Sequence, residues 1–296
     1  LIYSMEKLMS KCLETAHFSV RNTSSIPKSS TNQTTSFKEW WCIDFLIKEI
    51  KHKPELKDLP DSLVEKTLNE YLLKHKISLS NSIKERKIII KEIRAELRRY
   101  AGQYVSKSGI KKREELIKEG RFSDILNQHA STRERSIDYE EIKSIIKNLN
   151  LKSILDLGCG LNPLAIASPE TKYYAYDIKE EDLNIVREFF KKEGIKGEVH
   201  NKDIRLTENF PKVDLCIIFK VLDILGDNRN ETTRRLLTTI QSNFFLISFA
   251  TRTLSGKPMN SPYRRWFEKI LNELKYPYEV KRMKQEVVYI ISKCLN

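Results

Sequence analysis

Short apolar runs alternate with amphipathic patterns from residue 153 to the C-terminus. We expect strands near residues 153–157, 173–178, 197–202, 213–219, 244–250, 276–282 and 286–292. The spacing of apolar residues predicts helices near 182–193, 231–242 and 262–274. This alternation predicts an α/β fold with a Rossmann-like, mainly parallel, doubly wound sheet of seven strands. Its last two strands are expected to form an antiparallel hairpin at the edge.

No strand pattern precedes residue 153, where the apolar positions have helical spacing instead. We expect helices at 37–52, from Asp61 onward, from about 82 to 100 and at 138–149. In the third of these, the residues expected to face inward are Ile83, Ile90, Ile93 and Leu97. Between residues 22 and 36, nine of fifteen positions are Ser or Thr, too polar a stretch to order itself. We therefore divide the chain into a disordered extension (1–36), a basic helical RNA-binding domain (37–128) and an α/β domain (129–296).

The composition is that of a globular protein with one large or two modest domains, since 40% of the 296 residues are hydrophobic. No apolar stretch reaches the ~18 residues of a membrane helix, and no signal-peptide pattern opens the chain. The five cysteines have no metal-ligand spacing. We expect a cytoplasmic monomer with no metal and no membrane partner. The chain begins with Leu1, so Met5 or Met9 is an alternative start.

The chain is strongly basic, with a formal net charge of +13, which indicates a polyanionic partner such as nucleic acid. The segment from Arg86 to Arg121 holds twelve Lys or Arg against five acids. Cations on a compact helical unit favour binding to a phosphate backbone, although a solvated helix face has the same composition. The RNA-binding candidates in this segment are Arg98, Arg99, Lys111 and Lys112.

Candidate chemistry lies at the end of the first strand, in the turn from Asp156 through Gly158 to Gly160. Asp177 ends the second strand about 20 residues later, as in an adenosine-binding crevice where an acid holds the ribose hydroxyls. Asp203 follows the third strand. The turn lacks the glycine pattern of a pyrophosphate cradle, so the pattern indicates S-adenosyl-L-methionine. The full set of cofactor-binding candidates is Arg135, Asp156, Gly158, Gly160, Asp177, Ile178, Asp203, Ile204 and Phe219.

Within that set Arg135 is the first candidate for the cofactor carboxylate, and Arg133 is the second. Both belong to the stretch from His129 to Arg135, just upstream of the α/β pattern. Simple helix capping with exposed arginines would produce the same local sequence.

Several motifs together carry a resemblance. They are His-Ala-Ser-Thr-Arg-Glu-Arg (129–135), Asp-Leu-Gly-Cys-Gly-Leu-Asn-Pro-Leu-Ala (156–165), Phe219-Lys-Val-Leu222, Ser248-Phe249, Ser255-Gly-Lys257, Met259, Tyr263, Trp266-Phe-Glu268 and Val288-Tyr-Ile290. With them the sequence resembles the aminoglycoside-resistance 16S ribosomal RNA methyltransferases of the Arm/Rmt/Sgm/Grm type. The resemblance begins near Ile88 and departs from the family at Ala250, Pro258 and Pro262.

The resemblance implies an enzyme that makes 7-methylguanosine in the decoding-site helix of small-subunit 16S rRNA, with S-adenosyl-L-methionine as methyl donor and antibiotic resistance as one outcome. The ring nitrogen that accepts the methyl group has a lone pair and no proton, so no general base is expected. Phe219 or Phe249 could stack on an extruded guanine, and Lys220 could hydrogen-bond it. Arg252, Lys257 and Arg264 could hold RNA phosphates.

Three alternatives stay open: housekeeping methylation of another rRNA nucleotide, ribosome binding without catalysis, and methylation of a protein or small molecule.

Overall fold

The computed structural model describes residues 34–77, 82–101, 107–128, 130–226, 228–252, 257–259 and 262–293. The chain divides into two compact units, Leu1–Cys42 and Ile43–Asn296. Of the first unit, only the beginning of helix α2 (Thr34–Lys51) lies in the described ranges. The predicted disordered extension therefore lies outside the described residues up to residue 33, and its last three residues belong to α2.

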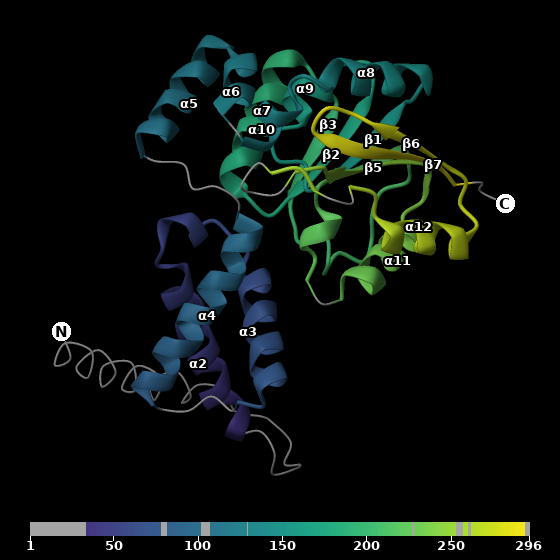
Figure 1. Cartoon of the computed structure of the whole chain (residues 1–296). Helices are drawn as coiled ribbons and strands as arrows, with labels where there is room; N and C mark the ends of the chain where they lie inside the picture. The colour runs from purple at the N-terminus through teal and green to yellow at the C-terminus, as the bar shows by residue number, and fades with distance from the viewer. Residues whose placement is uncertain are drawn as a thin grey trace, which may run out of the picture. The chain divides into compact units, whose positions relative to one another are not determined.

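The second unit is built on a seven-stranded sheet with the order β3-β2-β1-β4-β5-β7-β6 (Figure 1). Its strands are β1 (Ser153–Leu157), β2 (Lys172–Asp177), β3 (Gly197–Asn201), β4 (Val213–Phe219), β5 (Ser242–Ala250), β6 (Tyr278–Arg282) and β7 (Glu286–Ser292). The first five run parallel, while β7 is antiparallel to β5 and to β6. The predicted doubly wound sheet with a terminal hairpin is confirmed. Because β1 and β4 are neighbours at the centre, the order reverses between them, which is where open α/β sheets bind ligands.

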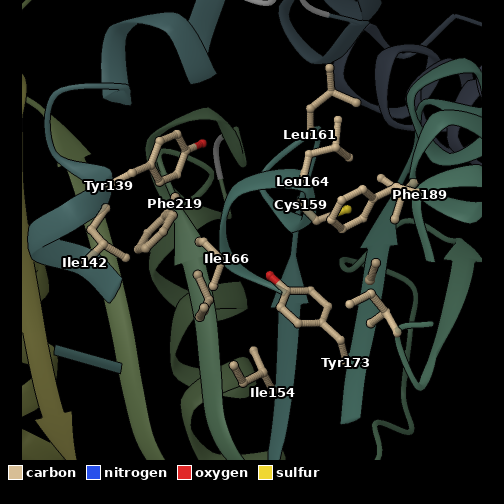
Figure 2. Close-up of a cluster of buried hydrophobic side chains, with 14 of the residues drawn as sticks. Tyr139, Ile142, Ile154, Cys159, Leu161, Leu164, Ile166, Tyr173, Phe189 and Phe219 are labelled. Atoms are coloured by element: carbon tan, nitrogen blue, oxygen red, sulfur yellow. The ribbon is translucent and has the colours of Figure 1, made fainter. Parts of the chain in front are cut away.

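Helices cover both faces of the sheet, and each face has its own apolar core. Those of one layer are α5 (Lys107–Glu119), α6 (Phe122–Gln128), α7 (Ala130–Arg135), α8 (Tyr139–Asn148), α9 (Pro163–Ile166) and α10 (Glu180–Glu193), as Figure 1 shows. Those of the other are α11 (Arg229–Thr239) and α12 (Arg265–Leu274), with the short helix η3 (Leu222–Ile224) after β4. Figure 2 shows part of the first core, where Phe219, Tyr139 and Ile142 lie together.

A separate apolar cluster holds the helices before residue 102 together. It is formed by α2, the short helix η2 (Pro54–Leu56), α3 (Asp61–His75) and α4 (Ile83–Ala101). Leu46, Leu68 and Ile93 are among its fully buried members. We refer to α2–α4 as the helical bundle. Ile93 and Leu97 of α4 are buried as predicted, but Ile83 at its start is 61% exposed and Ile89 takes an inward position.

Helices α5 and α6 were not placed individually by the sequence pattern. Their apolar residues Leu116, Phe122 and Ile125 belong to the same buried cluster as the sheet residues. Arg113 of α5 is also buried, with its guanidinium 3.2 Å from the carboxylate of Asp182 on α10. The domain boundary at residue 128 stays a prediction. In the structure, α5 and α6, which precede that residue, pack on the sheet.

Candidate functional site

The glycine turn after β1 is tied directly to the neighbouring strand. The backbone N–H groups of Gly158 and Cys159 both donate to the carbonyl of Tyr176 on β2, at 2.8 and 3.0 Å. Gly158 has φ +69°, and a Cβ there would meet Cγ2 of Val221 at 2.4 Å. A side chain at position 158 would therefore be strained by its backbone and blocked by Val221. The turn requires glycine so that its backbone can face the crevice.

Asp177, at the end of β2, fixes the rest of this turn. One carboxylate oxygen accepts the N–H of Gly160 at 2.8 Å, and the other accepts those of Ile178 and Lys179 at 2.7 and 2.9 Å. Burial raises the pKa of Asp177, and the hydrogen bonds from the Gly160 and Lys179 N–H groups oppose that rise. The carboxylate thus organises three backbone amides at the edge of the sheet before any ligand is considered.

Asp156 lies beneath the turn and has no exposed surface. Its Oδ2 accepts the hydroxyl of Tyr173 at 2.8 Å, while Oδ1 has no hydrogen-bond partner among the described residues. Burial raises the pKa of Asp156 to about 7, although the Tyr173 hydroxyl lowers it. Oδ1 is thus a buried acceptor on the strand that leads into the glycine turn.

Asp203, after β3, pairs with the guanidinium of Arg205 at 2.9–3.2 Å and also accepts the Arg205 N–H. It is 6% exposed, and Ile204 beside it is buried in the core. Because β1, β2 and β3 are adjacent and parallel, Gly158, Asp177 and Asp203 all follow strand ends on the same edge. The structure therefore brings together the turn and acids that the sequence singled out.

Arg135, the first candidate for the cofactor carboxylate, lies in a buried ion pair. Its guanidinium is 2% exposed and donates to Glu286 Oε1 at 2.9 Å and to Asn162 Oδ1 at 2.5 Å. It also lies 4.6 Å from the ring centroid of Phe219. The ion pair with Glu286 gives Arg135 a structural role, and its role toward a cofactor carboxylate stays a prediction. Arg133, the second candidate, is exposed.

Sequence reasoning did not identify Glu286, the first residue of β7. Its buried Oε1 also lies 3.1 Å from the Lys220 ammonium, which lies 3.0 Å from Glu134 as well. The cations of Arg135 and Lys220 keep the pKa of Glu286 below its usual value despite burial. Lys220 itself has φ +60°, an uncommon conformation for a side-chain-bearing residue. The sequence feature that could have identified Glu286 is an acidic residue at the start of an otherwise largely apolar strand.

The two phenylalanines expected to stack on a base are core residues. Phe249 has no exposed surface and packs against Trp266, Phe267 and Tyr289 with centroid distances of 5.1–5.8 Å. Phe219 is 4% exposed and lies in the core on the opposite face of the sheet. Neither ring can contact a base in this structure without opening the core, which corrects both expectations.

Arg264 is also a structural residue. Its guanidinium donates to the carboxylate of Asp223 at 2.8–3.2 Å and to the Ala250 carbonyl at 3.0 Å. Its side chain is 10% exposed. Arg252 and Lys257, the neighbouring candidates for phosphate binding, are exposed. Of these three predicted phosphate ligands, Arg264 is thus already paired with a carboxylate of the protein.

Known proteins resemble this chain over more than half of its length. The family model described as "Ribosomal RNA methyltransferase (FmrO)" matches residues 115–290. The chain belongs to this family. A 16S rRNA (guanine(1405)-N(7))-methyltransferase from Serratia marcescens is 27% identical over 217 residues, which cover 71% of this chain and 85% of that relative. A protein of the same name from Frankia casuarinae is 27% identical over 179 residues, covering 57% of this chain and 63% of that relative.

Solved structures support the same fold. The 16S rRNA methylase RmtB has a TM-score of 0.70 at 24% identity, covering 85% of this chain and 98% of that one. The 16S rRNA methyltransferase RmtF, solved with S-adenosyl-L-homocysteine, has a TM-score of 0.72 at 21% identity, covering 89% and 100%. Within the described ranges of this FmrO-family protein, no helix is both long and apolar enough to span a membrane. Nor do three or more described His, Cys, Asp or Glu residues gather as a metal site.

The helical bundle of this FmrO-family protein carries a basic recess of about 260 Å³. It is lined by Glu49, Lys53, Lys87, Ile90, Lys91, Arg94 and Arg98. Arg94 donates to the Ile50 and Glu49 carbonyls at the end of α2, and Arg98 pairs with Glu55 at 2.9 Å. Lys87 and Lys91 are exposed one helical turn apart on α4. Of the other predicted RNA-binding residues, Arg99 and Lys112 are exposed, and the side chain of Lys111 lies outside the description.

Proposed function

We propose that this FmrO-family protein transfers a methyl group from S-adenosyl-L-methionine to the ring nitrogen N7 of a guanine in 16S rRNA. The observation that carries the proposal is the turn at the β1 edge, where glycine is required at 158 and Asp177 binds three backbone amides. The relatives from Serratia marcescens and Frankia casuarinae bear the name of this reaction. Drug resistance of the host would follow if the decoding-site guanine is the target.

The residues around the turn fit the cofactor. Adenosine needs a close backbone approach and an acid for its ribose hydroxyls, which Gly158, Gly160 and Asp177 provide. Asp203 closes the same edge of the sheet. When bound, S-adenosyl-L-methionine supplies a methyl group on a positively charged sulfur. Because Arg135 is already paired with Glu286, we assign the cofactor carboxylate to Arg133.

The acceptor side needs positioning more than proton transfer, since N7 of guanine has a lone pair and no proton. Lys220 is the cation at the carboxyl end of β4, beside the switch in strand order. Its ammonium can donate a hydrogen bond to a guanine, provided that the exposed Glu134 gives way. The base must leave its stack to reach this edge.

The helical bundle is proposed to hold the small ribosomal subunit through rRNA phosphates, with Arg99, Lys87 and Lys91 as its exposed cations. Lys112, Arg252 and Lys257 are exposed outside the helical bundle and are proposed as further phosphate contacts. Because the proposed substrate is ribosomal, we propose that the protein acts in the cytoplasm. We also propose that it is a monomer.

The experiment is methyl transfer from labelled S-adenosyl-L-methionine to small subunits, naked rRNA and total protein, followed by mass spectrometry of the RNA. A 7-methylguanosine in 16S rRNA is the expected product. Asp177→Ala should bind the cofactor about tenfold or more weakly by calorimetry, because three amides and the ribose lose their acceptor. Binding of subunits without any methyl transfer would favour the non-catalytic alternative, and label in protein would overturn the RNA assignment.

A further inference from the structure

The proposed reaction needs a surface that receives an extruded base, and the buried phenylalanines do not provide it. Among the described residues, Tyr263 is the one aromatic side chain in the set of exposed large apolar residues, at 43%. It follows β5 and comes directly before Arg264 and helix α12. An aromatic ring with this much exposed surface next to a sheet edge is a candidate for stacking on a base.

The backbone around Tyr263 is held firmly by its neighbour. The Arg264 guanidinium donates to Asp223 Oδ2 at 2.8 Å, to the Ala250 carbonyl at 3.0 Å and to the Pro262 carbonyl at 2.6 Å. The Arg264 N–H donates to the Tyr289 hydroxyl at 3.2 Å. These contacts fix the chain on both sides of Tyr263 to the carboxyl end of β5 and to η3. A ring on so fixed a backbone can receive a base with little loss of entropy.

The same contacts connect the segment of Tyr263 to the residues after β4 that pack on the cofactor turn. Asp223, the partner of Arg264, lies two residues after Val221, and Val221 is the side chain against which a Cβ at Gly158 would collide. Ile224, next to Asp223, is 41% exposed. Two exposed large apolar residues, Ile224 and Tyr263, are thus the sequence neighbours of the two members of one ion pair, Asp223–Arg264.

We propose that Tyr263 is the substrate-contact residue on which the extruded guanine stacks, with Ile224 as a smaller apolar contact beside it. This proposal rests on the proposed function, because it names the surface that receives its target base. The Asp223–Arg264 pair then acts as a positioning element for the ring. Stacking is tolerant of the ring's polar group, so the Tyr263 hydroxyl is not required.

The test is single-turnover methylation of small subunits by the full-length protein at saturating enzyme, with subunit binding and cofactor binding measured separately. Tyr263→Ala should lower the methylation rate about tenfold or more, as expected for loss of one stacked base, while cofactor affinity stays unchanged. Tyr263→Phe should retain the parental rate, and Ile224→Ala should lose less than Tyr263→Ala. Leu73→Ala, which removes an apolar side chain 79% exposed on α3, is the control for surface changes and should match the parent.

The outcomes separate the two proposals. If the parental protein methylates no guanine, the proposed function fails irrespective of Tyr263. If the parent is active and Tyr263→Ala is equally fast, the stacking role is overturned. A loss in Tyr263→Ala that comes with weaker cofactor binding or a lower melting temperature would also overturn it, because Tyr263 would then be a structural residue. A loss shared by Tyr263→Phe would contradict stacking and indicate a role of the hydroxyl.

Discussion

Cations occur both at the sheet edge and on the helical bundle, but they have opposite environments. Arg135 and Arg264 at the sheet edge are 2% and 10% exposed by side chain, and each faces a carboxylate within 2.9 Å. On the bundle, Lys87 and Lys91 are exposed on one face of α4 beside a basic recess. A sequence-level count of positive charge treats all four alike. The first two are buried in ion pairs, whereas the second two are the exposed cations that we propose for contact with a polyanion.

This difference has a physical cause. A buried guanidinium that is already paired with a carboxylate cannot exchange that partner for a new anion without leaving a buried charge unpaired. An exposed ammonium loses little by exchanging its mobile counterions for a phosphate. Arginine close to a cofactor motif is thus no better a candidate ligand than an exposed lysine farther away, unless its partners are known.

The strongest test of this comparison is Arg135→Ala. It removes a buried cation that contacts Glu286, Asn162 and the Phe219 ring, and it leaves Glu286 with Lys220 as its charged partner. We expect a loss of about 3 kcal/mol in the free energy of unfolding, measured by urea denaturation.

Arg133→Ala is the matched control, because it removes an exposed guanidinium from the same short helix α7. Its unfolding should stay within about 0.5 kcal/mol of the parent, while its cofactor affinity falls. The reverse pattern, a stable Arg135→Ala that no longer binds cofactor, would restore Arg135 as the carboxylate ligand.

A second test concerns the rigid part of the sheet edge. Gly158→Ala should destabilise the protein by about 2 kcal/mol, because its φ of +69° disfavours a side chain and the new methyl group meets Val221. The double variant Gly158→Ala/Val221→Ala should recover the steric part of this loss and keep the backbone part, about 1 kcal/mol. Equal unfolding of the single and double variants would show that the turn tolerates a side chain by moving.

A third test concerns the exposed cations of the helical bundle, which the double variant Lys87→Glu/Lys91→Glu reverses. Loss of two phosphate contacts should lower the slope of log affinity against log salt for small subunits by about 1.5, with cofactor affinity unchanged. Lys143→Glu/Lys147→Glu on α8 makes the same change in net charge on another exposed face and should alter the slope less. Should the two double variants weaken binding alike, net charge and not the basic recess would explain subunit affinity.

Periodicity was sufficient to predict the sheet, because strands buried on both faces are unbroken apolar runs: β1, β4 and β7 begin and end at the predicted residues. The common edge that carries Gly158, Asp177 and Asp203 followed from the same pattern, whereas the order of the strands was not predicted. The partners of side chains could not be predicted this way. Glu286 is 151 residues from Arg135 along the chain, and no local pattern encodes an ion pair over such a separation. For the same reason Phe249 and Arg264 could be given functional roles from motif position alone, although tertiary packing places them in the core and in an ion pair.

The last test concerns Asp156 at the sheet edge, where burial opposes the charge of the carboxylate and raises its pKa to about 7. An acid with a higher pKa in the folded state holds its proton there between pH 4 and 7, where the unfolded chain releases it. Its contribution to stability is therefore fully present below about pH 4 and is lost as the pH rises through 7. Asp156→Asn has no such titration and keeps an acceptor for the Tyr173 hydroxyl.

Urea unfolding without cofactor at pH 5, 6, 7 and 8 should show Asp156→Asn gaining on the parent as the pH rises. Tyr173→Phe sharpens the test, because it removes the hydroxyl that lowers the pKa of Asp156. The stability of Tyr173→Phe should fall as the pH rises, as in the parent, and should continue to fall to a higher pH than in the parent. Parallel curves for the parent and Asp156→Asn would mean that the carboxylate is already ionised at pH 5. Asp156 would then be a buried negative charge beneath the turn in the absence of the cofactor.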